Sequence, residues 1–280
     1  MKIGLAQIDC VSGDIDSNIK KFDEFALQAK SLGCEVVIFP EMSDTGYVTS
    51  IIPKVAQPWS ESGKPYIRAS NAARSNSINL ICGISEKVGD NIYNSIAYFN
   101  ANGELKGSYR KTHLFSPLPV CEDKCFRAGD LLSTIDIGDI KFGLSICFDL
   151  RFPEVYRYLT LNGAVVLLNC SAWPITRPSH WDHLTRARAI ENQAFFIGVN
   201  RVGTDGELTF NGRSRAISPI GDLVIEGSSD TEELIVCEID INKVKEFRNA
   251  IPAITARRDD IYKQSSINEQ IIGNLLINNV

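Results

Sequence analysis

Residues 36–39, Val-Val-Ile-Phe, form an entirely apolar run that stops at Pro40. A strand with one face in water alternates apolar and polar residues, whereas a strand covered on both faces is apolar throughout. Residues 2–8 form an earlier strand. Between the two strands apolar side chains recur at helical spacing, at Ile19, Phe22, Ala26 and Ala29. Asp16 or Ser17 can cap this helix. The chain therefore begins with a β-α-β unit whose second strand needs a covering layer on each face.

The rest of the chain combines such crossovers with β-hairpins. Helices are expected at residues 66–76, 153–161 and 180–192, and strands at 80–84, 91–99, 105–110, 135–137, 142–147, 164–168 and 194–200, with further strands within 214–241. Turn sequences at Asn102-Gly103 and Gly138-Asp139 predict two of the hairpins. Because no linker, repeat or low-complexity segment interrupts this order, we expect one layered domain with mixed sheets.

Charge and hydropathy exclude several classes of partner. Lys and Arg number 29 against 34 Asp and Glu, which gives a net charge of −5, and no basic run stands out. Nucleic acid and anionic membrane surfaces are therefore not expected as partners. The N-terminus does not resemble a signal peptide, and no apolar stretch reaches the roughly 18 residues of a membrane helix. Eight scattered cysteines then indicate buried thiols in a reducing compartment, and a cytoplasmic protein is expected.

Three predicted strands end in a reactive side chain. Glu41 follows residues 36–39, Lys111 follows 105–110, and Cys147 ends 142–147. Ligands of open α/β sheets bind at strand ends, where side chains point into a crevice. If the three side chains meet there, the thiol can act as nucleophile, the carboxylate can take its proton and the ammonium can stabilise an oxyanion. Each residue alone is weak evidence, because rim carboxylates, exposed lysines and buried cysteines are common.

The segments around these residues resemble the signature blocks of the nitrilase superfamily of carbon–nitrogen hydrolases. The blocks are Phe39-Pro40-Glu41, Tyr109-Arg110-Lys111-Thr112-His113 and residues 145–154 (SICFDLRFPE). The resemblance extends from Lys2 to about Tyr262, with the blocks in the family's order and spacing. It implies an α/β fold in the form of a four-layer αββα sandwich of two mixed sheets.

The same resemblance implies a catalytic triad of Glu41, Lys111 and Cys147 that needs no metal and no organic cofactor. Glu122 lies eight residues before Asp130. This placing resembles a second glutamate of the family, which hydrogen-bonds near the lysine and helps to position the substrate. The resemblance also implies a homodimer formed through the helices after Cys147 and near His180.

Other segments resemble the amidase branch of the superfamily, and most closely bacterial ω-amidase-like proteins. These segments are Ala172-Trp173-Pro174, His180-Trp181, residues 187–193 and Asn200-Arg201-Val202-Gly203. True nitrilases usually carry a tryptophan directly after the nucleophile, whereas this chain has Phe148. The expected reaction is hydrolysis of a small linear carboxylic-acid amide, such as 2-oxoglutaramate or 2-oxosuccinamate, through a Cys thioester. Deaminated-glutathione amidase and N-carbamoyl amine amidohydrolase are the alternatives within the superfamily.

Several residues are expected to shape the site around the nucleophile. The Lys111 cation should favour the Cys147 thiolate, and the Phe148 backbone N–H should help Lys111 to hold the oxyanion. Tyr47 and Trp173 are expected to line the pocket, and Arg177 to pair with a substrate carboxylate. A surface position for Arg177 and a purely structural Trp173 remain open. Asp149 and Arg151 are expected to form a structural ion pair behind the nucleophile.

Three other classes of function compete with this interpretation. A papain-like site would pair Cys147 with His180 or His183, but neither histidine stands in a recognisable signature. A metal site would use Cys121, Cys125, His180 and His183, whose spacing lacks the second pair of a zinc knuckle and the glutamate of a metalloprotease helix. A non-catalytic interaction scaffold would have no need for Glu, Lys and Cys together.

The expected domain spans residues 1–262, and residues 263–280 form a C-terminal tail. Ile267, Ile271 and Leu275 would share one helical face in that tail. Such a face suggests an arm that docks on the body of the protein or on a second subunit.

Overall fold

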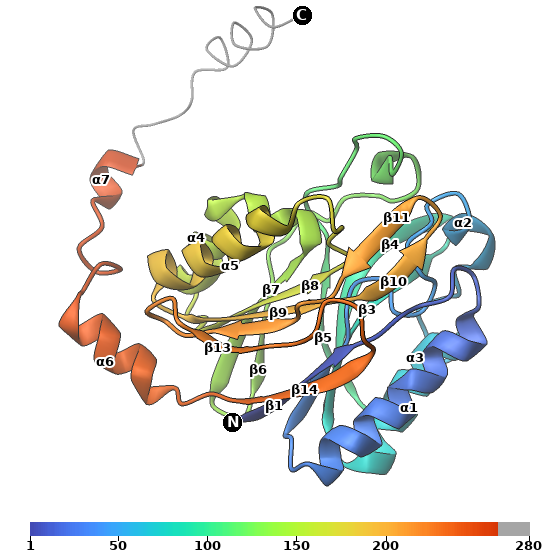
Figure 1. Ribbon diagram of the computed structural model, residues 1–280, viewed down its shortest axis with the longest axis horizontal. Coiled ribbons are helices and arrows are strands. Elements are labelled where there is room, and N and C mark those ends of the chain that lie inside the picture. Colours follow the sequence, from blue (N-terminus) through green and yellow to red (C-terminus); the bar gives the residue numbers. More distant parts are fainter. Residues whose placement is uncertain (263–280) are drawn as a thin grey trace, which may run out of the picture.

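Two six-stranded sheets pack face to face, and helices cover the outer face of each sheet (Figure 1). The computed structural model describes residues 1–262. The first sheet has the order β14-β1-β2-β3-β4-β5 and the second β13-β12-β9-β8-β7-β6. Helices α1 and α3 cover the first sheet, and α4 and α5 cover the second. This arrangement confirms the expected α/β fold with four layers in the order αββα.

The strands and helices have the following bounds. The first sheet contains β1 (Lys2–Gln7), β2 (Val36–Ile38), β3 (Asn79–Val88), β4 (Asn91–Phe99), β5 (Leu105–Arg110) and β14 (Glu233–Glu238). The second contains β6 (Thr134–Ile137), β7 (Ile140–Ile146), β8 (Val166–Ser171), β9 (Phe195–Asn200), β12 (Arg215–Ile217) and β13 (Leu223–Glu226), and a separate hairpin pairs β10 (Val202–Asp205) with β11 (Leu208–Asn211). The helices are α1 (Ile15–Ser31), α2 (Ile52–Val55), α3 (Lys64–Asn76), α4 (Pro153–Leu161), α5 (Pro178–Asn192), α6 (Asn242–Ala250) and α7 (Asp259–Tyr262), with 3-10 turns at Glu122–Lys124 and Cys147–Arg151.

Both sheets follow one pattern of strand pairing. From β14 to β5 the successive pairs are antiparallel, parallel, parallel, antiparallel and antiparallel. The same order recurs from β6 through β7, β8, β9 and β12 to β13. Parallel neighbours need a crossover connection, and each of these crossovers contains a helix. The two sheets therefore share a topology, although the sequence itself shows no repeat.

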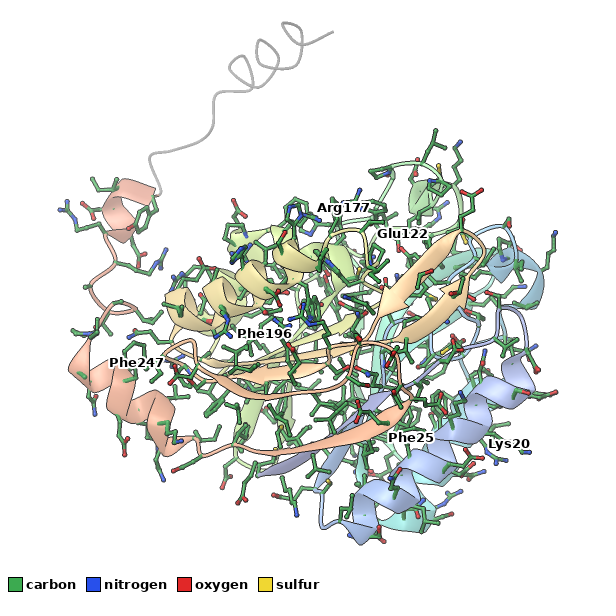
Figure 2. All side chains as sticks on the ribbon, in the orientation of Figure 1. Lys20, Phe25, Glu122, Arg177, Phe196 and Phe247 are labelled. Carbon is green, nitrogen blue, oxygen red and sulfur yellow. The ribbon has the colours of Figure 1, made fainter. Side chains whose placement is uncertain are left out.

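The apolar run 36–39 contributes to two separate cores, as its composition predicted. Val36 and Ile38 face the second sheet and belong to the central core between the sheets. Val37 and Phe39 belong to the core under α1 and α3. On α1, Phe25 points toward the sheet, whereas Lys20 points away from it (Figure 2).

Three local features differ from the sequence prediction. Helix α1 begins at Ile15, and its capping residue is Asp14, whose side chain accepts a hydrogen bond from the Ser17 N–H, instead of Asp16 or Ser17. The hairpin β10–β11 was missed because its four-residue strands are too short to show a clear alternation. Helix α6 was missed as well. The tail predicted at 263–280 lies outside the described residues. Within residues 1–262 no helix is both long enough and apolar enough to span a bilayer.

A close contact between β3 and the segment after β2 determines where Glu41 lies. The Phe39 N–H donates to Ile81 O and the Ser43 N–H donates to Gly83 O, both at 2.8 Å. A Cβ atom on Gly83 would lie 2.4 Å from Pro40 O and 2.7 Å from Glu41 Cα, which is closer than carbon atoms can approach. Gly83 therefore allows the chain to follow β3 beyond Pro40 and to carry Glu41 to the end of the sheet.

Candidate active site

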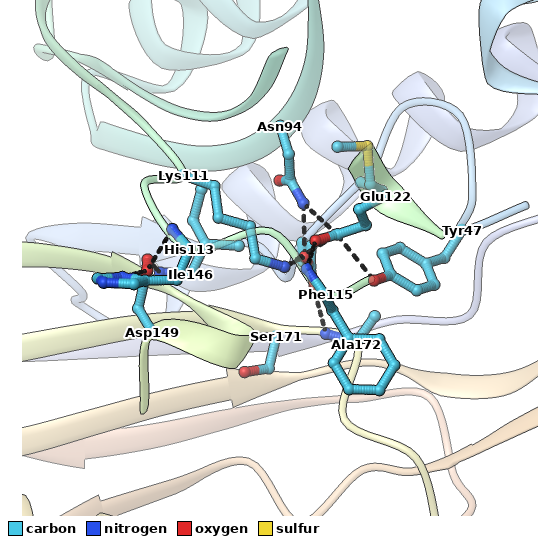
Figure 3. A network of polar contacts seen from close by, with 12 residues as sticks. Tyr47, Asn94, Lys111, His113, Phe115, Glu122, Ile146, Asp149, Ser171 and Ala172 are labelled. Carbon is cyan, nitrogen blue, oxygen red and sulfur yellow. Dashed lines mark hydrogen bonds and ion pairs between the residues drawn. The ribbon is translucent and has the colours of Figure 1, made fainter. Parts of the chain in front are cut away.

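The three strand ends that carry Glu41, Lys111 and Cys147 meet at one end of the sandwich. Lys111 Nζ lies 2.9 Å from Glu41 Oε1 and 2.9 Å from Glu122 Oε1, and all three side chains are fully buried. Among the charged groups, Glu41 has the largest effect on the pKa of the Cys147 thiol, so Cys147 belongs to the same cluster. Lys111, Asn94 and Tyr47 point toward Glu122 in the close view of this network (Figure 3). The structure thus brings all four residues that the sequence placed in a catalytic site into one cluster.

Backbone donors and polar side chains hold both carboxylates of the cluster. Glu41 Oε2 accepts a hydrogen bond from the Ala172 N–H at 2.7 Å, and Glu122 Oε2 accepts one from the Phe115 N–H at 2.6 Å. Tyr47 donates its hydroxyl to Glu122 Oε1 at 2.8 Å. Each carboxylate is thereby fixed from two sides, and this compensates for the loss of its hydration shell.

The nucleophile turn has a strained start. Cys147 has a φ of 41°, a left-handed conformation that is uncommon for a residue with a side chain. Asp149 stabilises the turn, because its Oδ2 accepts hydrogen bonds from the Ile146 N–H at 2.9 Å and from the Tyr109 hydroxyl at 2.7 Å. Its Oδ1 lies 2.8 Å from His113 Nδ1 (Figure 3). Asp149 therefore ties the Cys147 turn to the segment that carries Lys111.

The expected ion pair between Asp149 and Arg151 is wrong. Asp149 is fully buried and is saturated by donors from the Lys111 segment and from its own turn. Arg151 points instead toward the cavity beside Cys147, where its guanidinium lies 4.9 Å from the centre of the Trp173 ring. The two side chains leave the turn in different directions because Asp149 caps the backbone that precedes it.

Burial dominates the protonation behaviour of the cluster. Burial raises the pKa of Glu41, Glu122 raises it further, and the Lys111 charge only partly offsets both. Burial alone would lower the pKa of Lys111, but Glu122 and Glu41 raise it well above its ordinary value, so Lys111 is an ammonium ion. Two carboxylates thus share one cation in a place with little water.

The Lys111 charge favours the Cys147 thiolate, as expected, but other forces outweigh it. Burial and the Glu41 charge raise the pKa of Cys147 well above its ordinary value, and the opposing effect of Lys111 is smaller. The resting nucleophile is therefore a neutral thiol. A neighbouring base must remove its proton as it reacts, and Glu41, whose charge acts on the thiol and whose own pKa is raised, is suited to do so.

A cavity of about 210 Å³ opens above Cys147. Residues predicted to shape the pocket border it, and they are Tyr47, Phe148, Trp173 and Arg177. Trp173 also has a structural role, because only 2% of it is exposed and its indole N–H donates to Arg177 O at 2.9 Å. The two interpretations of Trp173 therefore both apply. A cavity of this volume suits a small linear molecule, since pockets for drug-sized ligands start at roughly 300 Å³.

Two guanidinium groups border this cavity without a carboxylate partner in residues 1–262. Arg151 contacts His180 Nδ1 at 3.2 Å, and Arg177 lies 5.9 Å from the centre of the Phe115 ring. Burial and the nearby Arg177 charge lower the pKa of Arg151. Arg177 and Glu122 lie at the same end of the sheets (Figure 2). The cavity therefore carries two positive groups on its border, and Cys147 is the member of the buried cluster that lines it.

Residues 1–262 show no comparable arrangement for a papain-like site or for a metal site. The charged groups that shift the pKa of Cys147 are Glu41, Lys111 and Glu122, and no histidine is among them. His180 contacts Arg151 instead. Across residues 1–262 no group of three or more His, Cys, Asp or Glu side chains has the geometry of a metal site, including the Cys121, Cys125, His180 and His183 set.

Sequence reasoning missed two polar residues at this site. Asn94 of β4 contacts both Glu41 and Glu122. In the sequence, nothing distinguishes Asn94 from the other polar residues of a predicted hairpin strand. Only the pairing of β4 with β5 places it beside Lys111. Arg151 follows Cys147 by four residues within the same 3-10 turn, and this short spacing was the available signal that it faces the pocket.

Comparisons with known proteins agree on one family. Residues 2–249 match the family model described as carbon-nitrogen hydrolase. The chain is 31% identical over 261 residues to the 2-oxoglutaramate amidase of Bacillus subtilis (strain 168), covering 93% of this chain and 98% of that protein. It is 30% identical over 264 residues to the omega-amidase NIT2 of Homo sapiens, covering 91% of this chain and 94% of that protein.

Solved structures give the same result. Nit3 of Saccharomyces cerevisiae, described as a member of branch 10 of the nitrilase superfamily, superimposes with a TM-score of 0.84 at 30% identity, covering 92% of this chain and 96% of that chain. The NitN amidase of Nesterenkonia sp. AN1 has the same fold, with a TM-score of 0.83 at 24% identity and coverage of 94% and 98%.

A titration can test the neutral state of Cys147. We expect the ultraviolet absorbance at about 240 nm, where thiolates absorb, to be the same for the wild type and Cys147→Ala at every pH below 9.0, the ordinary pKa of a cysteine. The difference between the two proteins isolates Cys147 from the seven other cysteines. A thiolate signal from Cys147 near neutral pH would contradict this result and would show that the Lys111 charge outweighs burial.

Proposed function

Because the chain belongs to the carbon–nitrogen hydrolase family, we propose that it is an ω-amidase, which hydrolyses the terminal amide of a 2-oxo dicarboxylic acid such as 2-oxoglutaramate or 2-oxosuccinamate. One observation carries the proposal. The buried cluster of Glu41, Lys111 and Cys147 opens into a small cavity whose rim holds two guanidinium groups without carboxylate partners in residues 1–262. The names of the relatives in Bacillus subtilis and Homo sapiens point to the same substrate class.

The first half of the proposed reaction forms a thioester. Glu41 accepts the thiol proton while Cys147 Sγ attacks the amide carbon. The oxyanion of the tetrahedral intermediate is stabilised by the Lys111 ammonium and the backbone N–H of Phe148. One such donor is typically worth about 3 kcal/mol in the transition state. Glu41 then returns the proton to the amide nitrogen, the C–N bond breaks, and ammonia leaves.

The second half hydrolyses the thioester. A water molecule attacks the acyl carbon while Glu41 accepts its proton, and the same donors stabilise the oxyanion. The C–S bond breaks, the thiol regains its proton from Glu41, and the carboxylic acid is released. Both halves need an ionised Glu41, whose pKa is raised mainly by burial. Activity is therefore lost as the pH falls through this raised pKa, above the 4.5 of an ordinary glutamate.

Arg177 and Arg151 are proposed to bind the substrate carboxylate. Guanidinium groups match a carboxylate in geometry and keep their charge near neutral pH. Tyr47, Phe148 and Trp173 would enclose the carbon chain, since they border the same cavity. Glu122 would hold Lys111 in place, as their 2.9 Å contact suggests.

We also propose that the protein is a cytoplasmic homodimer that pairs through α4 and α5. Tyr158 and Leu161 of α4 and Ile190 of α5 are about half exposed, and these apolar side chains would be covered in such a pair. Eight free cysteines suit a reducing compartment. Sedimentation velocity should give the mass of two chains for the wild type and of one chain for Leu161→Glu. A monomeric wild type would contradict this pairing.

Ammonia release tests the reaction directly. Purified protein should release ammonia from 2-oxoglutaramate, and Cys147→Ala should release none above background while keeping the wild-type melting temperature. Hydrolysis of deaminated glutathione, followed by the release of cysteinylglycine, or ammonia release from an N-carbamoyl amine, without turnover of 2-oxoglutaramate and again dependent on Cys147, would contradict the ω-amidase assignment and leave the catalytic groups in place. Turnover by Cys147→Ala at the wild-type rate would contradict the mechanism itself.

The role of Arg177 can be separated from catalysis by comparing two substrates. Arg177→Gln should raise KM for 2-oxoglutaramate by about tenfold, the equivalent of one partly exposed charge-assisted hydrogen bond. Its kcat should change less, because Arg177 does not touch the reacting atoms. For a short aliphatic amide without a carboxylate, the variant should match the wild type. Arg127→Gln, an exposed arginine that does not border the cavity, is the control. An equal effect on both substrates would contradict the role.

A further inference from the structure

Asn94 occupies a central position between the two buried carboxylates. Its Nδ2 donates to Glu41 Oε1 at 2.6 Å and to Glu122 Oε1 at 3.1 Å, and its side chain is fully buried. We propose that Asn94 is a positioning residue of the hydrolytic site, which bridges Glu41 and Glu122 as an uncharged donor and directs one oxygen of Glu41 to the Cys147 thiol. The inference rests on the proposed function of Cys147 as the nucleophile.

Asn94 duplicates the contacts of Lys111 without adding a charge. Lys111 Nζ donates to the same two oxygens, Glu41 Oε1 and Glu122 Oε1, at 2.9 Å each. The backbone carbonyl of Asn94 also accepts a hydrogen bond from the backbone N–H of Lys111 at 2.8 Å. One residue of β4 therefore holds both carboxylates through its side chain and the lysine through its backbone. The Asn94 amide and the Lys111 ammonium reach Glu122 together in Figure 3.

The pattern of donors determines which oxygen of Glu41 can act as the base. A carboxylate oxygen has two lone-pair directions. On Glu41, Oε1 accepts two hydrogen bonds, from Lys111 and Asn94, whereas Oε2 accepts one, from the Ala172 N–H. Oε2 therefore keeps a free lone pair for the thiol proton. Without Asn94 the proton could go to either oxygen, and the base would lose its fixed direction.

An uncharged donor is the suitable choice at this position. A second cation would balance the charge of both carboxylates and weaken Glu41 as a base. An apolar residue would remove one hydrogen-bond donor from each of the two buried carboxylates. Burial raises the pKa of Glu41, and the hydrogen bond from Asn94 acts with Lys111 in the opposite direction. Asn94 thus helps to keep Glu41 ionised in a place where burial favours the protonated acid.

The orientation of the Asn94 amide supports the same conclusion. Asn94 Oδ1 is buried and has no hydrogen-bond partner among the described residues. Turning the amide over would bring this oxygen against two carboxylate oxygens and would lose both donated bonds, so the two glutamates select the orientation. A buried carbonyl without a partner is unfavourable. The two hydrogen bonds that the amide N–H groups donate to the carboxylates offset this cost.

The pH dependence of the reaction separates positioning from a merely structural role. The test variants are Asn94→Ala and the nearly isosteric Asn94→Asp. The control is Asn192→Ala, because Asn192 is equally buried and its Oδ1 also has no partner, but it ends helix α5 away from the cluster. Two readouts are recorded against pH, namely kcat/KM for ammonia release and the rate of Cys147 alkylation by iodoacetamide, followed by mass spectrometry of the Cys147 peptide.

The acid limb of each profile is the range in which the rate falls as the pH is lowered. Loss of the Asn94 donor should move this limb to higher pH in both profiles, because Glu41 then takes up its proton more readily. Each pH unit of this shift lowers the rate on the limb about tenfold. Asn94→Asp should shift the limb at least as far, because it places a third carboxylate in the cluster. Asn192→Ala should lower the melting temperature and leave the limb in place.

An acid limb that stays at its wild-type pH in Asn94→Asp would overturn the inference, and so would an equal shift in Asn192→Ala. If Asn94→Ala fails to fold, Asn94→Asp decides. Alkylation needs no substrate, so it separates this inference from the proposed function. A protein that releases ammonia from no amide, but whose alkylation limb moves in the Asn94 variants, would contradict the ω-amidase assignment and support the role of Asn94.

Discussion

Two carboxylates share one ammonium ion at a site that water hardly reaches, and most other features of the molecule follow from this. Removing charges from water is costly unless each is paired and hydrogen-bonded. Glu41, Glu122 and Lys111 are fully buried, and their contacts with Ala172 N, Phe115 N, Tyr47 and Asn94 replace the lost water. Burial, together with the charge of the neighbouring carboxylates, raises the pKa of Glu41 and keeps Cys147 protonated until it reacts.

The sandwich allows this cluster to form because it draws the groups from both sheets. Glu41 and Lys111 extend from β2 and β5 of the first sheet, and Cys147 extends from β7 of the second. The central core between the sheets, to which Ile38 and Ile146 belong, sets the distance between the base and the nucleophile. Since packed interiors tolerate little change in volume, substitutions in this layer can alter the site without touching it.

The strand pattern and the signature blocks were enough to predict the layers and the residues Glu41, Lys111, Cys147 and Glu122 that meet at the site. Features that depend on contacts between distant segments were not predictable in this way. Asn94 matters only because β4 pairs with β5 and because the segment after β2 brings Glu41 to its side chain. The neutral state of Cys147 was not predictable either, because a sequence shows a nearby lysine but not the amount of burial that opposes its effect.

The charge distribution along the cavity also gives the proposed reaction a direction. A substrate with a carboxylate at one end and an uncharged amide at the other has its carboxylate near Arg151 and Arg177 when its amide lies beside Cys147, because both guanidinium groups border the cavity and have no carboxylate partner in residues 1–262. Hydrolysis converts the amide into a second carboxylate beside Cys147, close to the two buried carboxylates that share Lys111. Repulsion between like charges then favours release of the acid.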